Sequence, residues 1–366
     1  MQVTAAVARD PDHDFTIEVL ALDEPRDDEI LVRVSAVGIC HTDLVVKRDS
    51  SDQAPVVLGH EGAGTVVKVG EAVTKVKVGD KVALSFRSCG HCRQCATGHP
   101  AYCDDMIALN FSGLRTDGSK SLRDVRGAIA GNFFGQSSFA SFCLAYERNT
   151  VVVPGDMPME LLAPLGCGVQ TGAGAVMREL ACKVGTSILV TGGGAVGLSA
   201  VMGAVIQGCK IIVVLEVQSE RRLLAQKLGA THVIDPGAEP NIAQAVRRVC
   251  PAGVDYALDT TGLANVQSAA IDALARRGTL GLVAISPPET PMPGSLMTFM
   301  ATGQRIQGIV EGDSDPQTFI PELISLYRAG RFPIDKLVRT YPLTDINRAI
   351  RDQRNGSCTK AVLLTD

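Results

Sequence analysis

The most apolar stretch of the chain, residues 187–217, is divided by glycines and by Lys210. The glycines are Gly192, Gly193, Gly194, Gly197, Gly203 and Gly208. A membrane-spanning helix needs roughly 20 consecutive apolar residues, so this interrupted stretch does not read as one. The pattern predicts a strand at 187–191, a glycine turn, a buried helix to Gln207 and a second strand at 210–215.

The same alternation continues through the second half of the chain, from about Leu161. Further helices are expected at 220–228, 241–249 and 266–275, and further strands at 233–234, 256–258 and 279–284. Strands that alternate with helix-length segments are typical of a doubly wound parallel sheet. We therefore expect an α/β domain in this half.

The first half has a different pattern, in which short β-branched runs are broken by turn residues. The runs at 30–34, 64–69, 81–84 and 151–153 predict an antiparallel, barrel-like domain. Residues 88–130 form a lobe that is polar and shows no sustained helical or strand period. Such a lobe has little apolar core, so it needs a cross-link to stabilise it. From about Ile309, helices are predicted at 316–329 and 345–352 and a closing strand at 360–364, and this last stretch could return to the first domain.

The composition is that of a globular protein and does not favour a nucleic-acid-binding or membrane-binding one. The 366 residues are 46% hydrophobic, which is enough for about two domains, each with its own core. A net charge of -4 gives no reason to expect nucleic acid or an anionic membrane as partner, so small molecules are the better expectation. The first residues lack the basic and apolar segments of a signal peptide, which makes a cytoplasmic location the default expectation.

Four of the eleven cysteines lie within fifteen positions of the polar lobe. They are Cys89, Cys92, Cys95 and Cys103. Four thiolates can close a tetrahedral shell around zinc, and a closed shell makes the metal structural. Simple burial of small side chains does not predict this spacing in a polar segment. An iron–sulfur cluster is the sharper alternative, but it would imply electron transfer, for which nothing else in the sequence argues.

A second set of metal-binding residue types is scattered along the chain. Cys40, His60 and Cys167 each lie beside glycines, in the segments GICHTD (38–43), GHEG (59–62) and GCG (166–168). Taken singly, each is more often a core cysteine or a histidine satisfied by hydrogen bonds. Two thiolates and one imidazole would leave a fourth zinc position open for an alcohol or water, as catalytic zinc requires. The remaining histidines His13, His91, His99 and His232 receive no role.

With the glycine turn, these motifs make the chain resemble the zinc-containing medium-chain alcohol dehydrogenases over essentially its whole length. The resemblance joins Cys40, His60 and Cys167 into one catalytic zinc site, with Glu61 and Asp43 close behind the metal. It implies a GroES-like catalytic domain, residues 1–168 and 309–366, with its structural zinc lobe at 88–104. A Rossmann domain that binds NAD would then span residues 169–308.

The glycine turn has the form Gly192-x-Gly194-x-x-Gly197 and stands between a strand and a helix, where it can accept a pyrophosphate. Glu216 lies nineteen residues beyond Gly197, at the end of the next strand. Its carboxylate can accept hydrogen bonds from a ribose diol and would repel a 2′-phosphate, which favours NAD over NADP. Arg221 and Arg222 complicate this, because a nearby arginine can accommodate a 2′-phosphate. The resemblance places Arg221 near the adenosine ribose, His41 and Lys360 at the pyrophosphate, and Thr171 and Val196 beside the nicotinamide.

The resemblance also implies the chemistry, which is hydride transfer from an alcohol carbon to NAD with zinc as Lewis acid. Thr42 matches the hydroxyl residue that hydrogen-bonds the substrate oxygen and starts a proton relay. Many relatives finish that relay with a histidine where this chain has Val45, so either ribose and water or His41 must complete it.

Within the family, the segments 84–86, 133–139 and 164–172 look closest to the aryl-alcohol and geraniol dehydrogenases. Five phenylalanines could line an apolar pocket or be ordinary core: Phe86, Phe111, Phe133, Phe134 and Phe139. The open alternatives are a formaldehyde-adduct, polyol or secondary alcohol dehydrogenase, or a noncatalytic zinc and NAD redox sensor. Family members are usually dimers or tetramers, so a homo-oligomer is expected.

Overall fold

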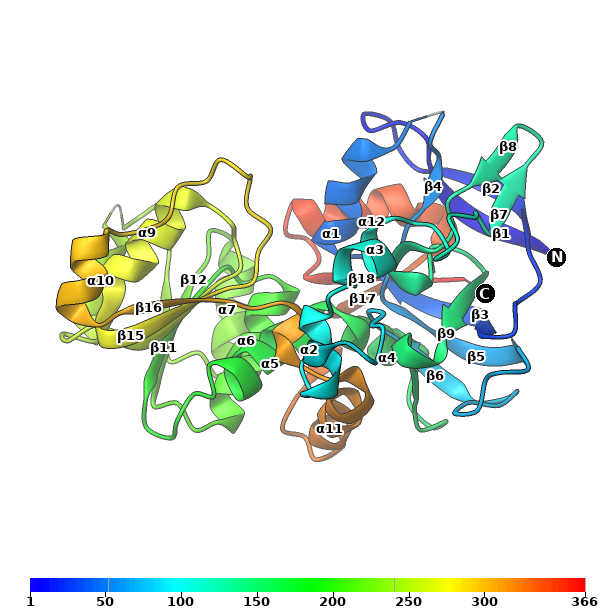
Figure 1. Cartoon of the computed structure of the whole chain (residues 1–366). Coiled ribbons are helices and arrows are strands. Elements are labelled where there is room, and N and C mark those ends of the chain that lie inside the picture. The colour runs from blue at the N-terminus through cyan, green and yellow to red at the C-terminus, as the bar shows by residue number, and fades with distance from the viewer. Residues whose placement is uncertain (52, 240, 366) are drawn as a thin grey trace. The chain divides into compact units, whose positions relative to one another are not determined.

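The structure is a computed structural model that describes residues 1–51, 53–239 and 241–365. The chain divides into two compact units (Figure 1). Unit 1 comprises Met1–Cys167, Asp315–Ile324 and Ile334–Asp366, and unit 2 comprises Gly168–Ser314 and Ser325–Pro333. No helix in the described part of the chain is both long and apolar enough to cross a membrane.

Unit 1 is built on two largely antiparallel sheets. In the first the strand order is β4 (Val56–Val57), β1 (Gln2–Ala8), β2 (Thr16–Leu22), β7 (Leu122–Asp124) and β8 (Gly127–Ile129). In the second the order is β10 (Thr150–Val152), β6 (Lys81–Leu84), β5 (Gly62–Val69), β3 (Glu29–Gly38), β18 (Lys360–Leu364) and β17 (Val338–Pro342), and β9 (Phe142–Tyr146) also pairs with β3. Their apolar faces share one core, which includes Val32, Val66 and Leu144. The predicted barrel-like domain is confirmed.

Short helices connect these strands and carry several of the motifs. They are α1 (His41–Val46), η1 (Lys47–Asp49), α2 (Arg93–Ala96), η2 (Pro100–Tyr102), α3 (Met106–Phe111), η3 (Phe133–Gly135), η4 (Glu147–Asn149), α4 (Met159–Leu162), η5 (Ala163–Gly166), η8 (Ile334–Lys336), η9 (Leu343–Asp345) and α12 (Ile346–Arg354). Helix α11 (Pro316–Arg328) has residues in both units. The lobe therefore holds short helices and the hairpin β7–β8, where the sequence predicted no regular element.

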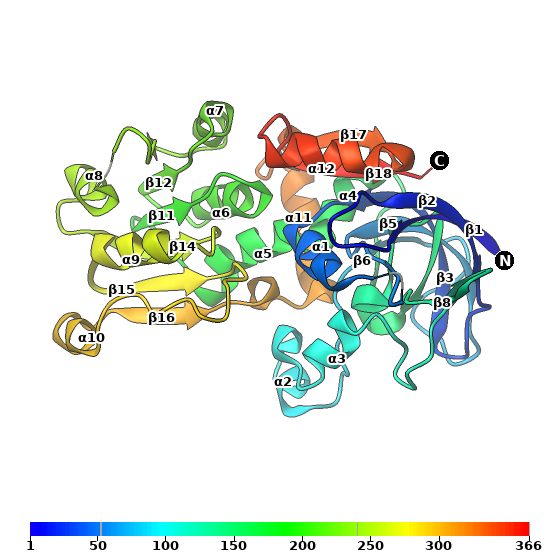
Figure 2. The ribbon, with the colours of Figure 1, turned by 90° about the horizontal axis from the view of Figure 1, so that it is seen from above.

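Unit 2 holds a six-stranded parallel sheet, which confirms the predicted doubly wound domain. Its strand order is β13 (His232–Ile234), β12 (Ile211–Leu215), β11 (Ser187–Thr191), β14 (Val254–Asp259), β15 (Leu274–Leu282) and β16 (Arg305–Gly308). Figure 2 shows β12, β11, β14, β15 and β16 side by side in this order. The order reverses direction beside β11, and ligands of such sheets bind at the carboxyl ends of the strands there.

The first two helical segments of unit 2 precede its strands, and the others connect successive strands or follow the last one. They are α5 (Gly168–Gly174), the π-helical turn η6 (Ala175–Glu179), α6 (Ala195–Ile206), α7 (Ser219–Lys227), α8 (Ile242–Val249), α9 (Ala264–Ala273), α10 (Leu296–Thr302) and η7 (Glu311–Asp313). Strands β11 and β18 match their predicted bounds, whereas β15 begins five residues earlier than residue 279 and α10 and β16 were not predicted.

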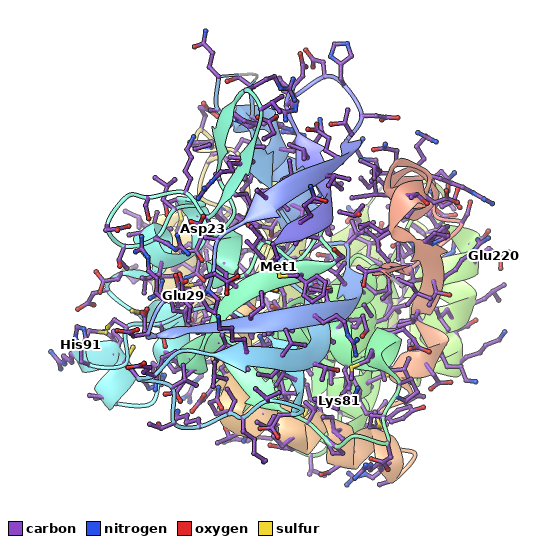
Figure 3. The ribbon with its side chains drawn as sticks, turned by 90° about the vertical axis from the view of Figure 1, so that its right-hand side faces the viewer. Met1, Asp23, Glu29, Lys81, His91 and Glu220 are labelled. Atoms are coloured by element: carbon purple, nitrogen blue, oxygen red, sulfur yellow. The ribbon has the colours of Figure 1, made fainter. Side chains whose placement is uncertain are left out.

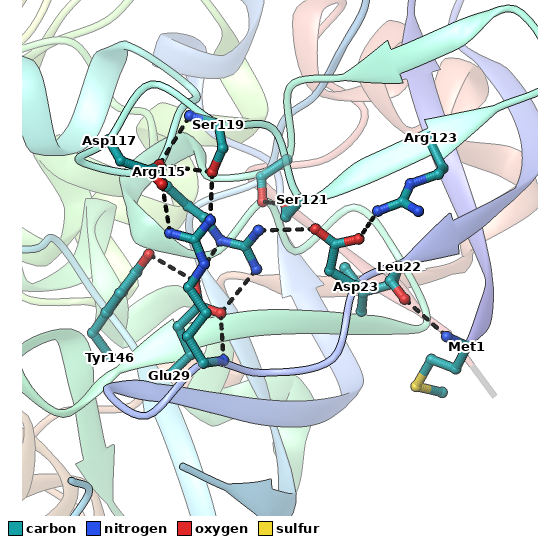
Figure 4. A network of polar contacts seen from close by, with 12 residues as sticks. Met1, Leu22, Asp23, Glu29, Arg115, Asp117, Ser119, Ser121, Arg123 and Tyr146 are labelled. Atoms are coloured by element: carbon teal, nitrogen blue, oxygen red, sulfur yellow. Dashed lines mark hydrogen bonds and ion pairs between the residues drawn. The ribbon is translucent and has the colours of Figure 1, made fainter. Parts of the chain in front are cut away.

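A buried ion network ties the lobe to strand β3 of unit 1 (Figure 4). The guanidinium of Arg115 donates to both oxygens of Glu29, at 2.7 and 2.9 Å, and to Asp23 Oδ2 at 2.9 Å. The Tyr146 hydroxyl donates to Glu29 Oε1 at 3.1 Å, and burial raises the pKa of Tyr146 to about 12. Glu29 is 1% and Arg115 5% exposed, so the pair is desolvated and depends on these contacts.

Candidate metal centres and cofactor turn

The carboxylate of Asp43 joins two of the predicted metal ligands. Its Oδ2 accepts a hydrogen bond from the Cys40 backbone N–H at 2.9 Å, which fixes the start of α1. Its Oδ1 accepts from the Gly59 N–H at 3.1 Å and lies 2.8 Å from Nδ1 of His60. Asp43 and His60 are both fully buried. One carboxylate therefore holds the Cys40 turn and the His60 ring in fixed relative positions.

The turn before His60 requires a glycine. Gly59 has a φ of +89°, and a Cβ there would lie 2.5 Å from the backbone nitrogen of Phe139. Beyond the turn, the ring of Phe134 stacks on the His60 ring with centroids 4.4 Å apart, and Phe133 meets it edge-on at 5.4 Å. With Nδ1 held by Asp43, the Nε2 atom of His60 is buried and has no hydrogen-bond partner among the described residues.

Cys167 directly follows η5, and its side chain lies beside that of Cys40. The Ser85 hydroxyl donates to the carbonyl of Gly166 at 2.6 Å, and this contact fixes the chain just before Cys167. The sulfurs of Cys40 and Cys167 lie 3.9 Å apart. The hydrogen bond from Cys167 holds the pKa of Cys40 well below its ordinary value, although burial raises it. Burial lowers the pKa of His60, but Asp43 and Cys40 together hold it well above its usual range.

The structure brings Cys40, His60 and Cys167 together with Glu61. One ligand atom from each of these four side chains lies within 4.8 Å of all the others. Glu61 Oε2 is 2.5 Å from the ammonium of Lys360, which also donates to the Ile39 carbonyl at 3.0 Å. Glu61 is fully buried and Lys360 is 2% exposed. This set of donors, with one buried nitrogen left without a partner, fits a zinc ion.

The four cysteines of the lobe form a second group of the same compactness. Their sulfurs, from Cys89, Cys92, Cys95 and Cys103, lie within 4.8 Å of one another. Backbone N–H groups donate to them: Cys92 to Cys89 at 3.3 Å and Cys89 to Cys103 at 3.2 Å. Backbone donors from Asp104 and Cys95 lower the pKa of Cys92 to about 6. Donors of this kind stabilise thiolates, so the lobe also fits zinc.

The two histidines of the lobe lie outside this group. His91 and His99 are exposed, and Figure 3 shows His91 pointing away from the ribbon. Both are surface residues, and neither receives a role at the metal group.

The glycine turn lies between β11 and α6 in unit 2. A Cβ on Gly197 would lie 1.9 Å from the carbonyl oxygen of Gly192, so only glycine permits this close approach. Glu216 follows β12, and its Oε2 accepts from the Gly193 N–H at 2.6 Å. Its Oε1 accepts from the Gln218 N–H at 2.7 Å. The carboxylate is therefore fixed beside the turn, as a ribose ligand would have to be.

The other predicted site residues lie at varied depths. Thr42 and Val196 are half-buried and His41 is exposed. Thr171, in α5, donates to Glu311 Oε2 at 3.3 Å. Arg221 is half-buried in α7, and its neighbour Arg222 pairs with Asp235 at 2.9 Å. Lys360 is bound to Glu61 within unit 1, and its contact with a pyrophosphate stays a prediction.

Sequence reasoning assigned no role to Gln136, which lies beside His60. Its side-chain amide donates to the carbonyls of His60 at 2.9 Å and Ser85 at 3.0 Å. Its oxygen accepts from the Gly62 N–H at 3.0 Å and from the Ser138 hydroxyl at 3.0 Å. Gln136 is fully buried and joins the segments that carry His60 and Ser85. A glutamine within an apolar motif was the available signal, because a buried amide needs such partners.

Comparison with known proteins identifies relatives that cover the whole chain. The family model of the alcohol dehydrogenase GroES-like domain matches residues 26–155, and that of zinc-binding dehydrogenases matches residues 195–328. Geraniol dehydrogenase from Castellaniella defragrans is 44% identical over 98% of this chain and 97% of its own length.

Two solved structures resemble the whole chain. An alcohol dehydrogenase zinc-binding domain protein from Burkholderia ambifaria is 49% identical, with a TM-score of 0.95 over 100% of this chain and 99% of that one. Benzyl alcohol dehydrogenase from Acinetobacter calcoaceticus is 40% identical, with a TM-score of 0.93 over 100% of both chains.

Proposed function

Because the chain belongs to the zinc-containing medium-chain alcohol dehydrogenase family, we propose that it oxidises primary aromatic or allylic alcohols to aldehydes and reduces NAD, reversibly. The predicted cofactors, zinc and NAD, are those of this family. The observation that carries the proposal is the convergence of Cys40, His60, Glu61 and Cys167 within 4.8 Å. Residues 1–168 and 309–366 would supply catalysis, and residues 169–308 would bind NAD.

Cys40, His60 and Cys167 would hold the catalytic zinc through two sulfurs and Nε2. Bound there, zinc supplies a Lewis acid that favours loss of the alcohol proton, and NAD accepts the hydride. Asp43 keeps the proton of His60 on Nδ1, so that Nε2 presents its lone pair. Lys360 holds the Glu61 carboxylate to one side by an ion pair. The lobe cysteines Cys89, Cys92, Cys95 and Cys103 would hold a closed, structural zinc.

The proton path starts at Thr42, whose hydroxyl oxygen lies 3.7 Å from the Cys40 sulfur. We propose that this hydroxyl also meets the substrate oxygen. Val45, half-buried in the same helix, cannot carry a proton onward.

We expect the pH dependence of turnover to lack a histidine step from this position. A Val45→His variant should release protons faster in a stopped-flow assay with a pH indicator, whereas Val45→Leu should match the parent. An unchanged rate in Val45→His would show that another route already carries the proton.

The preference for NAD rests on Glu216. Its fixed carboxylate can accept hydrogen bonds from a ribose diol and would repel a 2′-phosphate. Arg222 donates to the carbonyls of Glu216 and Val217 at 2.8 Å and pairs with Asp235. These contacts compete with any phosphate for its guanidinium.

The substrate class rests on similarity, with support from the aromatic packing. The relatives include a geraniol dehydrogenase and a benzyl alcohol dehydrogenase, whose names specify an allylic and an aromatic alcohol. Of the five phenylalanines, four are buried in the core of unit 1, which leaves only Phe111 half-buried. Phe133 and Phe134 nevertheless pack on the ring of His60, so this side of the proposed zinc ligand is apolar.

Metal analysis combined with NAD reduction tests the proposal directly. We expect two zinc ions per chain and higher kcat/KM for benzyl alcohol and geraniol than for ethanol. Cys167→Ser should lose one zinc and all turnover, while Cys143→Ser, a buried cysteine outside both groups, should keep both. If the enzyme instead prefers a polyol, a formaldehyde–thiol adduct or a secondary alcohol, the proposed class of primary aromatic or allylic alcohols is wrong. Bound zinc and cofactor without NADH production would favour a redox sensor. Sedimentation would test the proposed dimer or tetramer.

A further inference from the structure

The side-chain amide of Gln136 is fully buried and uses its whole hydrogen-bonding capacity. As a donor it reaches the carbonyls of His60 and Ser85, at 2.9 and 3.0 Å. As an acceptor it takes hydrogen bonds from the Gly62 N–H and the Ser138 hydroxyl, both at 3.0 Å. A glutamine amide offers two donors and two acceptor positions, so all of them are occupied. Buried bonds of this kind hold the groups they join at fixed distances.

The contact with Ser85 continues to a second proposed zinc ligand, Cys167. The Ser85 hydroxyl donates to the carbonyl of Gly166 at 2.6 Å, directly before Cys167. Glycine permits this approach, because a Cβ on Gly166 would lie 2.0 Å from the carbonyl oxygen of Leu84. A path of hydrogen bonds therefore runs from the backbone of one ligand, through the amide and Ser85, to the peptide group that precedes the other ligand.

The backbone around Gln136 has a conformation that local propensity does not favour. Phe134 and Ser137 have φ values of 52° and 51°, which residues with a Cβ adopt rarely. The Ser137 hydroxyl donates to the Val57 carbonyl at 2.6 Å, three residues before His60, and so helps to hold this turn in place. Conformations of this kind persist where surrounding contacts over-determine them, and they gather at functional sites.

We propose that Gln136 is a positioning residue that holds His60 and Cys167 at the spacing one zinc ion requires. Because its amide has no donor or acceptor position left, Gln136 does not bind the metal itself and acts through the backbone of His60 and Ser85. The inference rests on the proposed function, since it presupposes zinc on Cys40, His60 and Cys167.

This role differs from that of Asp43. Asp43 joins the Cys40 turn to the ring of His60, whereas Gln136 joins the backbone of His60 to the segment that carries Cys167. Together the two side chains link all three proposed ligands. Loss of the amide should therefore loosen one side of the site and leave the other side held.

The affinity for zinc, measured by competition with a chromophoric chelator, tests the proposal in the full-length protein. Gln136→Met keeps the length of the side chain and removes all of its hydrogen bonds. The affinity of the catalytic site should fall by about 10-fold or more, because partners behind a metal ligand contribute about 10- to 100-fold. The zinc of the lobe cysteines should keep its affinity and serves as an internal reference. Cys167→Ser, which should hold only the lobe zinc, identifies that step of the titration.

The matched control is Gln267→Met in unit 2. Gln267 is also buried, and its amide donates to Asp259 at 3.0 Å and to the Ser286 hydroxyl at 3.1 Å. Its replacement removes hydrogen bonds from a buried amide that lies outside both metal groups, so the affinity for zinc should match that of the parent. An equal loss of affinity in both variants would reveal a general loss of stability and overturn the positioning role.

Ser85→Ala tests the path to Cys167 and stays informative if Gln136→Met fails to fold. The change removes only the hydroxyl that donates to Gly166, and it should also lower the affinity of the catalytic site. If both side chains act along one path, the double variant should lose about as much affinity as Gln136→Met alone. Losses that add would show that the amide does not reach Cys167 through Ser85.

Failure of this inference is distinguishable from failure of the proposed function. A parent protein that binds only the lobe zinc would contradict the proposed function itself. Two zinc ions in the parent, with the same affinities in Gln136→Met, would contradict only the role of Gln136.

Discussion

At the scale of single residues, the proposed catalytic site depends on a carboxylate that does not itself touch the proposed metal. Asp43 bonds both the Cys40 backbone and the ring of His60. We expect Asp43→Asn to weaken zinc binding at this site by about 10- to 100-fold, because partners behind a metal ligand contribute to this extent. Competition with a chromophoric chelator would measure the loss.

The protein offers a matched control for this prediction. Asp10 and His13 form a similar pair at 3.1 Å, but both side chains are exposed. Asp10→Asn should therefore leave the affinity for zinc unchanged. Equal zinc affinity in the Asp43 and Asp10 variants would show that Asp43 does not orient His60.

Glu216 carries the second prediction at this scale. Glu216→Ala removes the acceptor beside the glycine turn and the charge that would repel a 2′-phosphate. The KM for NAD should rise, and the ratio of kcat/KM for NADP to that for NAD should increase by about 10-fold or more, since each lost hydrogen bond to a charged group is worth about 1.5–3 kcal/mol. Glu220→Ala, an exposed residue of α7 (Figure 3), should leave the ratio unchanged.

The sequence predicted these residues by type and neighbourhood, but not their contacts. Glycines beside Cys40, His60 and Cys167 mark tight turns, and the resemblance supplied their grouping. Neither spacing nor composition could show that Lys360 pairs with Glu61, because 299 positions separate them and the contact depends on how β18 pairs with β3. The stacking of Phe134 on His60 likewise depends on a φ of 52° in a turn, which no local propensity predicts.

At the scale of elements, the lobe is held by two different devices. One is the buried pair of Arg115 and Glu29 (Figure 4). Arg115→Ala should lower the free energy of unfolding by about 3–5 kcal/mol, because it leaves the Glu29 carboxylate buried without its cation. Arg26→Ala breaks an ion pair with Asp117 whose side chains are exposed, and should cost less than about 1 kcal/mol. Urea unfolding of both variants measures the difference, and equal losses would contradict this account of the network.

The other device is the four-cysteine group. Cys103→Ser should remove one zinc per chain and loosen the lobe, since its short helices have little apolar core of their own. Limited proteolysis should then cut within residues 88–104 well before the rest of the chain. Cys358→Ser, a buried cysteine outside the group, should retain the parent's cleavage pattern. A lobe that resists the protease after losing its zinc would show that the metal is not its staple.

The elements that the sequence predicted best are those with a strong apolar period. β11 and β18 are buried runs of β-branched and aliphatic residues, and their bounds were predicted to the residue. β16 was not predicted because it is a four-residue edge strand, RIQG, with little apolar character. α10 was not predicted either, although four of its residues are methionine, leucine or phenylalanine, because it lies exposed and shows no buried face.

At the scale of the whole molecule, the fold class followed from the contrast between the two halves. Alternating strands and helices predicted the parallel sheet, and β-branched runs between turns predicted the barrel-like domain. The strand pairings needed the structure, because register between distant segments leaves no local signal. The closing strand is the clearest case: Val362 of β18 pairs with Gly38 of β3.

That pairing sets an order of events during synthesis. Strand β3 and the proposed zinc ligands leave the ribosome long before β17 and β18, so the second sheet of unit 1 must wait with these two strands missing. Until Lys360 arrives, Glu61 has no ammonium beside it. All of unit 2 lies between β3 and β18 in the sequence and can fold meanwhile. Until β18 is made, the nascent chain therefore exposes the edge of β3 to which β18 pairs. A chaperone that binds unpaired strand edges would bind the chain at this edge.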